Sequence, residues 1–174
     1  MSTETKDVLN ADFFDDDDDE NEDAQKDMYF TFKVGEEEYG VDISCVLEVA
    51  GIQKITEVPD MPDFVKGVIN LRGQVIPVID VRLRFKMEPM EYNDRTCILV
   101  VTIKEMSVGL IVDQVRDVVH IKEDNVEPPP KMSNKPGARY IKGLGKLDEE
   151  VKILLDLQKL LYDEELEKIE AAVE

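Results

Sequence analysis

The sequence is poor in the residue types that carry most catalytic and metal chemistry. Its 174 residues include one histidine, two cysteines and no tryptophan, and only 6% of them are aromatic. His120 follows two apolar residues, which is more typical of an edge or core position than of a catalytic base. No histidine–cysteine cluster has the spacing of a metal site, and Gly143-Leu144-Gly145 is too short for a phosphate-binding loop. The sequence therefore predicts a binding module and not an enzyme, with no metal and no cofactor.

Long apolar runs and concentrations of positive charge are also missing. No stretch approaches the roughly 18–20 apolar residues of a membrane-spanning helix, and the N-terminus lacks the basic, then apolar, pattern of a signal peptide. We therefore expect a cytoplasmic protein with no direct membrane insertion. The net charge of −19 argues against a nucleic-acid partner, because phosphate backbones and single strands are bound by basic grooves.

The two cysteines, Cys45 and Cys97, both lie in apolar, strand-like segments. They predict buried thiols of a reduced cytoplasmic protein, and a disulfide between them is the alternative.

The negative charge is concentrated at the N-terminus. Residues 1–27 contain 12 acidic and 2 basic residues, and Asp15 to Glu20 is an unbroken acidic run. An EF-hand loop that began at Asp15 would need glycine at its sixth position and glutamate at its twelfth, where this chain has Glu20 and Lys26. Such runs repel themselves and stay solvated. We therefore predict a disordered acidic tail over residues 1–27.

The rest of the chain consists largely of short runs of β-branched residues, which favour strands. Two such runs flank Arg72-Gly73-Gln74, where Gly73 can adopt a positive φ, so a tight hairpin is predicted within residues 65–82. Further strands are predicted over residues 28–33, 39–43, 53–58, 96–103, 108–112, 115–121 and 151–155. Residues 44–49 are expected to form a short helix or turn. A closing helix is predicted over residues 163–174, where three apolar residues share one face.

Two halves of the chain match each other in register. Pairs separated by 69 residues are Gly40 and Gly109, Val46 and Val115, Val49 and Val118, and Pro59 and Pro128. After an insertion in a proline-rich loop, pairs separated by 76 residues are Lys66-Gly67 and Lys142-Gly143, Leu71 and Leu147, Val75 and Val151, and Asp80 and Asp156. The repeat predicts an all-β fold of two similar, intertwined five-stranded β-barrels with a groove between them. The halves cover about residues 28–88 and 95–162, and short C-terminal helices follow.

The first hairpin differs from its repeat at positions that suggest function. Asn70 and Arg72 correspond to Lys146 and Asp148 in the second copy. The fold as such does not require arginine at this tip. Arg72 is therefore expected to contact a partner, or to brace its turn through Asp80.

The motifs of this chain resemble the CheW-like family of bacterial chemotaxis coupling proteins, over about residues 29–161. The motifs that carry the resemblance are Tyr39-Gly40-Val41-Asp42-Ile43 with Val46-Leu47-Glu48-Val49, Lys66-Gly67-Val68-Ile69-Asn70-Leu71-Arg72-Gly73, Pro77-Val78-Ile79-Asp80-Val81-Arg82, Val112-Asp113-Gln114-Val115-Arg116-Asp117-Val118 and Gly143-Leu144-Gly145. The resemblance implies a CheW-like domain over residues 28–162. It also implies a cytoplasmic adaptor, associated with membrane receptor arrays, that joins a chemoreceptor's cytoplasmic tip to the regulatory domain of the histidine kinase CheA. The acidic tail is not part of the family's core.

The resemblance also implies which residues meet each partner. Kinase binding falls on Val46 and Glu48, and receptor binding falls on Gly67, Asn70, Arg72, Val115 and Val118. Core packing is the alternative for the three valines, because the repeat relates Val46 to Val115. A backbone role is expected for Gly67, which recurs as Gly143.

Overall fold

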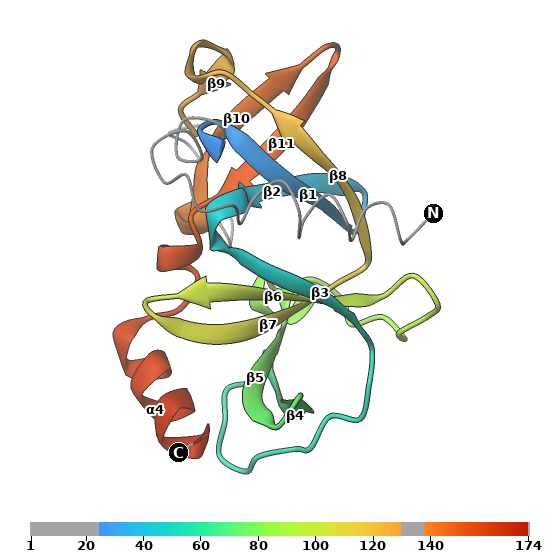
Figure 1. Ribbon diagram of the computed structural model, residues 1–174, viewed down its shortest axis with the longest axis vertical. Coiled ribbons are helices and arrows are strands. Elements are labelled where there is room, and N and C mark those ends of the chain that lie inside the picture. Colours follow the sequence, from blue (N-terminus) through green and yellow to red (C-terminus); the bar gives the residue numbers. More distant parts are fainter. Residues whose placement is uncertain (1–24, 130–137, 174) are drawn as a thin grey trace.

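The computed structural model describes residues 25–129 and 138–173, and Figure 1 shows their arrangement. The elements of these ranges are, in order, β1 (Met28–Val34), β2 (Glu37–Asp42), η1 (Ile43–Cys45), β3 (Val46–Gly51), β4 (Val65–Leu71), β5 (Gln74–Asp80), α3 (Val81–Arg84), β6 (Cys97–Ile103), β7 (Met106–Val112), β8 (Gln114–His120), η2 (Glu123–Asn125), β9 (Val126–Glu127), η3 (Ala138–Tyr140), β10 (Ile141–Leu147), β11 (Glu150–Leu155), η4 (Leu157–Lys159) and α4 (Asp163–Val173). Residues 1–24 of the predicted acidic tail lie outside the described residues.

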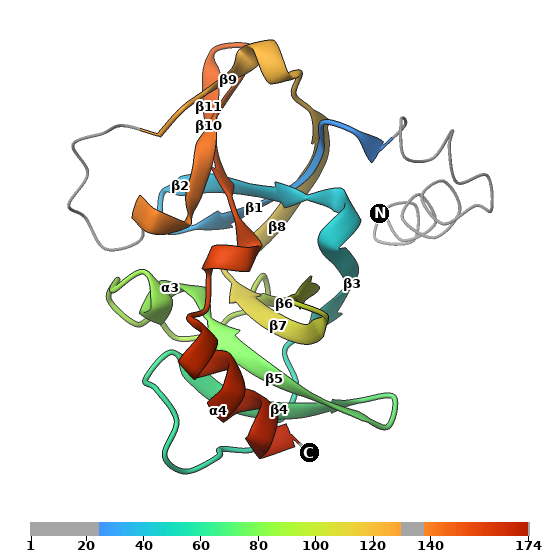
Figure 2. The same ribbon diagram turned by 90° about the vertical axis from the view of Figure 1, so that its left-hand side faces the viewer.

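The strands form two sheets that lie one above the other along the long axis of the molecule (Figures 1 and 2). Sheet A has the order β8-β1-β2-β11-β10-β9, and sheet B has the order β3-β6-β7-β5-β4. Helix α4 lies beside sheet B (Figure 2). The predicted all-β class with short C-terminal helices is confirmed.

The two sheets are assembled from both halves of the repeat. By the 69- and 76-residue offsets, β1, β2 and β3 correspond to β6, β7 and β8, and the β4–β5 hairpin corresponds to β10–β11. Sheet A combines β1 and β2 of the first half with β8, β10 and β11 of the second, and sheet B combines the complementary set. Each half thus completes the sheet of the other. The predicted intertwining is confirmed, whereas closure of each sheet into a barrel and the groove between barrels stay predictions.

The central strands are apolar on both faces because each lies between two cores. In β6, Leu99 and Val101 point into the largest buried cluster, which also contains Phe30 and Phe32 of sheet A. The alternate residues of the same strand, including Ile98, belong to a separate cluster inside sheet B. This arrangement explains why the sequence of β6 is an almost continuous apolar run and not an alternating one.

Two local predictions were wrong. Residues 53–58 form no strand, and only one bridge joins Thr56 to Val68. The apolar residues of this segment, Ile52 and Ile55, instead pack on the core inside sheet B. The helix or turn predicted over residues 44–49 is limited to η1, since β3 already begins at Val46.

The C-terminal helix is attached to the body through a buried arginine. Arg84, at the end of α3, donates to the carbonyl of Leu160 at 2.8 Å and to both carboxylate oxygens of Glu165 at 3.0 and 2.8 Å. Its guanidinium lies 4.2 Å from the ring centre of Phe64. Ile169 completes the attachment by packing into the core between the sheets.

Candidate partner-binding surface

The tip of the β4–β5 hairpin is a tight two-residue turn. Both central residues have positive φ, 56° at Arg72 and 86° at Gly73, the geometry that matches the twist of the flanking strands. The side-chain oxygen of Asn70 accepts a hydrogen bond from the backbone N–H of Gly73 at 2.9 Å. Asn70 therefore stabilises the turn, and Arg72 is the side chain that the turn presents.

Arg72 is paired with Glu48 and not with Asp80. Its Nη1 lies 3.1 Å from a carboxylate oxygen of Glu48, and the two side chains are 71% and 28% exposed. The carboxylate of Asp80 instead accepts from the backbone N–H groups of Arg82 and Leu83 and from the hydroxyl of Tyr92. The alternative in which Arg72 braces the turn through Asp80 is therefore wrong.

A bulge in β3 directs Glu48 toward the hairpin. Val46 pairs with Val101 and Glu48 pairs with Val100, so Leu47 is an extra residue in the strand. A strict period of two would put Glu48 on the same buried face as Val46, and the bulge breaks that period. Val46 is 4% exposed and lies in the core, whereas Leu47 is 45% exposed.

Sequence reasoning missed two apolar residues of this surface, Leu47 and Val75. Val75 lies opposite Asn70 in the hairpin and, like Leu47, is 45% exposed. The repeat counterpart of Val75, Val151, is exposed as well, at 51%. The sequence alone does not reveal which strand residues face outward. We call Leu47, Glu48, Asn70, Arg72 and Val75 the hairpin surface.

Gly67 is required by the backbone. Its φ is +144°, and a Cβ atom at this position would lie 2.1 Å from the carbonyl oxygen of Thr56. The same oxygen accepts from the N–H of Val68 at 2.9 Å. In the second copy, a Cβ on Gly143 would approach the carbonyl oxygen of Glu127 at 2.9 Å. The glycine therefore permits the segment before β4 to pack against the strand.

Val115 and Val118 lie on β8, in the other sheet from the hairpin surface. They pair with Phe32 and Phe30 across a bulge that matches the one in β3. Both valines are partly buried and pack on the core between the sheets. Their packing fits the core alternative, and partner contact stays a prediction.

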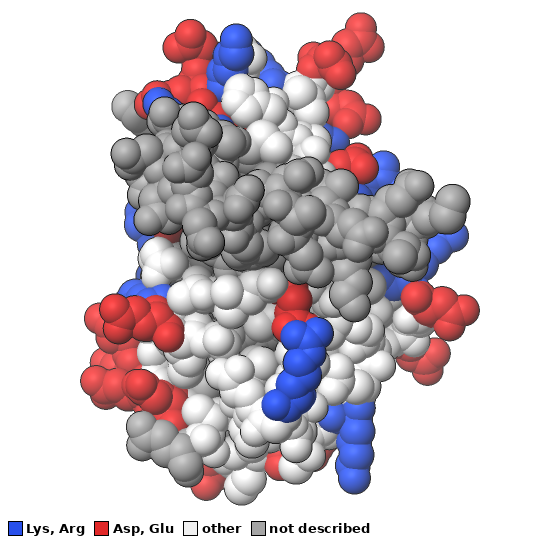
Figure 3. All heavy atoms as spheres, viewed as in Figure 1, with Lys and Arg blue, Asp and Glu red and all other residues white. Residues whose placement is uncertain are grey.

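The surface over sheet B is less charged than the composition suggests. On the face shown in Figure 3, much of the lower half is uncharged, but acidic and basic side chains meet near its centre, and further acidic residues gather at its edge. The net charge of the whole chain is −19.

Two groups with a raised pKa, Tyr92 and Lys152, belong to polar networks, each beside a single sheet. Burial raises the pKa of Tyr92, and its hydrogen bond to Asp80 adds to the effect. Burial lowers the pKa of Lys152, but hydrogen bonds to Glu150 and Glu38 outweigh it, so the pKa is raised. Glu38 also contacts Arg116 at 3.2 Å, which ties β2 to β8. Cys45 and Cys97 are free thiols, and burial raises the pKa of both.

Within residues 25–129 and 138–173, no three histidine, cysteine or acidic side chains are grouped so that they could hold a metal ion. None of the helices described in these ranges has the length and apolarity needed to cross a membrane.

The fold and this surface define an internally duplicated all-β interaction module. The family model of the CheW-like domain matches residues 28–165, so the chain belongs to the CheW family of chemotaxis scaffold proteins. Members of this family are scaffold proteins and not enzymes, which confirms the prediction of a non-enzymatic role.

Curated relatives and a solved structure agree with this assignment. The chain is 38% identical to the chemotaxis protein CheW of Klebsiella aerogenes over 138 residues, which cover 79% of this chain and 83% of the relative. It is 32% identical to CheW of Treponema pallidum over 143 residues, or 80% of this chain and 84% of the relative. The crystal structure of the scaffolding protein TtCheW from Thermoanaerobacter tengcongensis superposes with a TM-score of 0.74 at 36% identity, covering 80% and 94% of the two chains.

Proposed function

We propose that this chain couples chemoreceptors to the histidine kinase CheA by binding a receptor's cytoplasmic tip and the kinase's regulatory domain at the same time. The observation that carries the proposal is the hairpin surface, on a chain of the CheW family. The protein acts in the cytoplasm, in association with membrane receptor arrays. It requires no cofactor and no metal.

The kinase side of the proposal is centred on the bulge of β3. Leu47 offers an exposed apolar side chain, and Glu48 adds a carboxylate beside it. Val46 supports both from the core beneath. An apolar centre with a charge at its rim suits a β-barrel partner, because the charge selects the partner and the apolar contact stabilises the complex.

The receptor side is centred on Arg72. Its guanidinium is a planar fork of donors at a rigid tip, and a helical receptor tip offers carboxylates and carbonyl groups that accept such donors. Asn70 and Gly67 hold the turn and the strand that present Arg72. Val115 and Val118 contribute from β8. Receptor state then changes the stability of the ternary complex and so the activity of the kinase, by linkage.

Titration calorimetry with a receptor cytoplasmic fragment and a kinase regulatory domain tests this function. We expect the chain to bind each partner alone and both together. Glu48→Gln removes the charge without placing two cations together, so it should weaken kinase binding in a salt-dependent way. Glu91→Gln, on the exposed connection after α3, is the control and should bind normally. Binding to neither partner would remove the proposed function.

A further inference from the structure

Asp113 is the residue at which the chain crosses from one sheet to the other. It lies between β7, in sheet B, and β8, in sheet A. Its backbone N–H donates to the carbonyl of Lys33 in β1 at 3.0 Å. Val115 and Val118 follow two and five residues later on β8. Asp113 therefore determines where the strand with these two valines begins.

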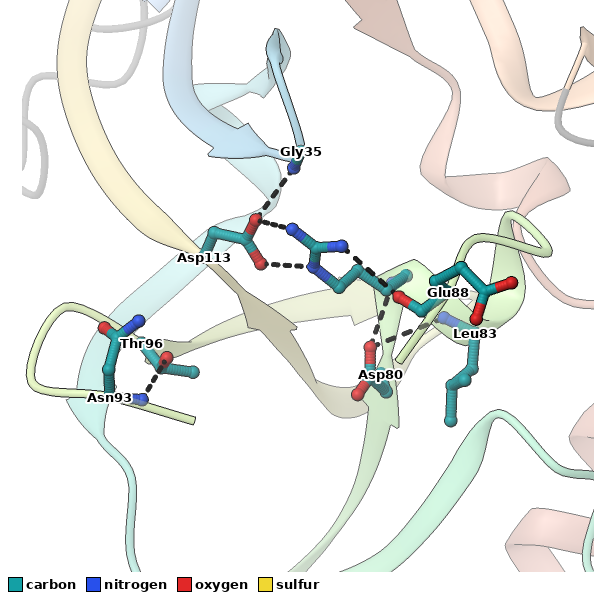
Figure 4. Close-up of polar contacts among 8 residues, drawn as sticks. Gly35, Asp80, Leu83, Glu88, Asn93, Thr96 and Asp113 are labelled. Atoms are coloured by element: carbon teal, nitrogen blue, oxygen red, sulfur yellow. Dashed lines mark hydrogen bonds and ion pairs between the residues drawn. The ribbon is translucent and has the colours of Figure 1, made fainter. Parts of the chain in front are cut away.

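The carboxylate of Asp113 accepts three hydrogen bonds (Figure 4). Arg82 donates from Nε at 2.9 Å and from Nη2 at 2.6 Å, and the backbone N–H of Gly35 donates at 2.7 Å. The two charged side chains are 15% and 17% exposed. The hydrogen bond to Asp113 raises the pKa of Arg82. A bidentate pair with this little solvent fixes orientation as well as distance.

Arg82 is itself fixed to the end of the β4–β5 hairpin. Its backbone N–H donates to the carboxylate of Asp80 at 2.9 Å, and its Nη1 donates to the carbonyl of Glu88 at 3.3 Å. The other carboxylate oxygen of Asp80 accepts from Tyr92 at 2.8 Å. The contacts thus run without a break from the last residue of β5 to the residue that precedes β8.

At the second crossing of the fold, the two side chains that correspond to Arg82 and Asp113 form no ion pair. By the repeat offsets, the counterparts of Gly35, Arg82 and Asp113 are Lys104, Gln158 and Ser44. Gln158 accepts from the backbone N–H of Lys104 at 2.8 Å. Ser44 donates to Asp42 through both its N–H and its hydroxyl. Since the other crossing has no arginine–aspartate pair at the corresponding positions, the duplicated fold as such does not require one here.

We propose that Arg82 and Asp113 are positioning residues that hold β8 in a fixed orientation to the β4–β5 hairpin, so that receptor and kinase are engaged together. This inference rests on the proposed function. Neither residue needs to touch a partner. The ion pair acts by keeping the strand with Val115 and Val118 and the hairpin with Arg72 in one rigid arrangement.

Hydrogen exchange of the full chain tests the structural part without any partner. In Asp113→Asn and Arg82→Gln, amides of residues 114–118 should exchange about tenfold faster, because the start of β8 opens locally. Residues 46–49, at the other crossing, should keep the wild-type rates. The matched control Gln158→Ala should leave residues 114–118 unchanged. If Asp113→Asn and Arg82→Gln both fold and exchange at β8 is unchanged in each, the proposal is overturned.

Partner titrations on the same variants test the functional part. The ratio of kinase affinities with and without saturating receptor fragment measures the linkage between the two sites. In Asp113→Asn and Arg82→Gln this ratio should move toward one, while each partner alone binds within about twofold of wild type. Gln158→Ala should keep the wild-type ratio. A wild-type ratio despite faster exchange at β8 would overturn the positioning role.

The remaining outcomes separate the two hypotheses. If the wild type binds neither partner while β8 loosens as expected, positioning of β8 stands and the proposed function fails. If Asp113→Asn does not fold, Arg82→Lys keeps the positive charge with fewer donors and should give an intermediate exchange rate.

Discussion

Arg72 and Glu48 join the two flanks of sheet B, since Arg72 lies at the tip of the β4–β5 hairpin and Glu48 lies in β3 at the opposite edge. Their counterparts in the second half are Asp148 and Asp117. Two carboxylates repel each other, so only the first copy has an attractive pair at this place. The residue proposed for the receptor and the residue proposed for the kinase thus contact each other, and a change in one alters the surroundings of the other.

A charge reversal separates bracing from partner contact at this pair. Arg72→Ala and Glu48→Ala should each lower the free energy of unfolding by less than about 1 kcal/mol, because the pair is exposed. The double variant Glu48→Arg with Arg72→Glu restores the ion pair but reverses both charges that a partner meets. We expect it to fold like the wild type and to bind receptor and kinase fragments poorly. Restored binding in the reversed pair would show that bracing is the whole role.

Gly67→Ala should be strongly destabilising. The new methyl group would lie 2.1 Å from the carbonyl oxygen of Thr56, at a φ of +144°. Relief of this overlap requires a backbone shift, and we expect a loss on the order of 3 kcal/mol or more in chemical denaturation. Gly51→Ala is the control, because no atom lies within 4 Å of the position that its new methyl group would take. A mild effect of Gly67→Ala with lost receptor binding would instead favour direct contact at this residue.

The C-terminal helix should depend on Arg84. Arg84→Met keeps the apolar stem of the side chain but leaves the carboxylate of Glu165 without its bidentate partner. The free energy of unfolding should therefore fall by about 3 kcal/mol. Lys104→Ala removes a solvent-exposed ion pair to Asp163 in the same helix and should change the melting temperature little. Circular dichroism melts of the two variants provide the comparison. Equal effects would mean that the guanidinium does not anchor α4.

Tyr92 should make stability sensitive to alkaline pH. Burial, with the hydrogen bond to Asp80, raises its pKa in the folded protein above the ordinary value of 10.0. Its contribution is therefore fully present below pH 10 and is lost as the pH rises, because the unfolded chain ionises first. Tyr92→Phe should be less stable at pH 7 by roughly 1 kcal/mol, since Asp80 loses a donor. It should also lose less stability than the wild type between pH 9 and 11.

The remaining alkaline sensitivity of Tyr92→Phe has an expected source. Burial also raises the pKa of Tyr39 and Tyr140, so the decline should shrink without vanishing. Parallel stability curves for the variant and the wild type above pH 9 would contradict the assignment to Tyr92.

Local chemistry and spacing predicted much of the fold. Gly73 indicated the turn because glycine adopts a positive φ without steric strain. The recurrence of Val46 and Val49 as Val115 and Val118 indicated duplication, and the paired strands follow the same offsets. The role of Gly67 was also expected from its counterpart. These features depend on residues that are adjacent in the chain, or on the same residue recurring at a constant offset. Both can be read directly from the sequence.

Contacts between distant residues were decided by the tertiary structure. Arg72 and Glu48 are 24 residues apart, and Arg82 and Asp113 are 31 apart. Arg72 and Glu48 meet across a sheet that strands of the second half complete, and a bulge in β3 changes the direction of Glu48. Arg82 and Asp113 meet because the chain crosses between the sheets beside the end of β5. Composition and the spacing of apolar residues identify the apolar strands. Which of the many carboxylates pairs with each arginine depends on strand order and sheet curvature. The sequence by itself therefore determined a duplicated all-β chain with one distinctive hairpin, and the exchange of strands between halves determined which charges hold it together.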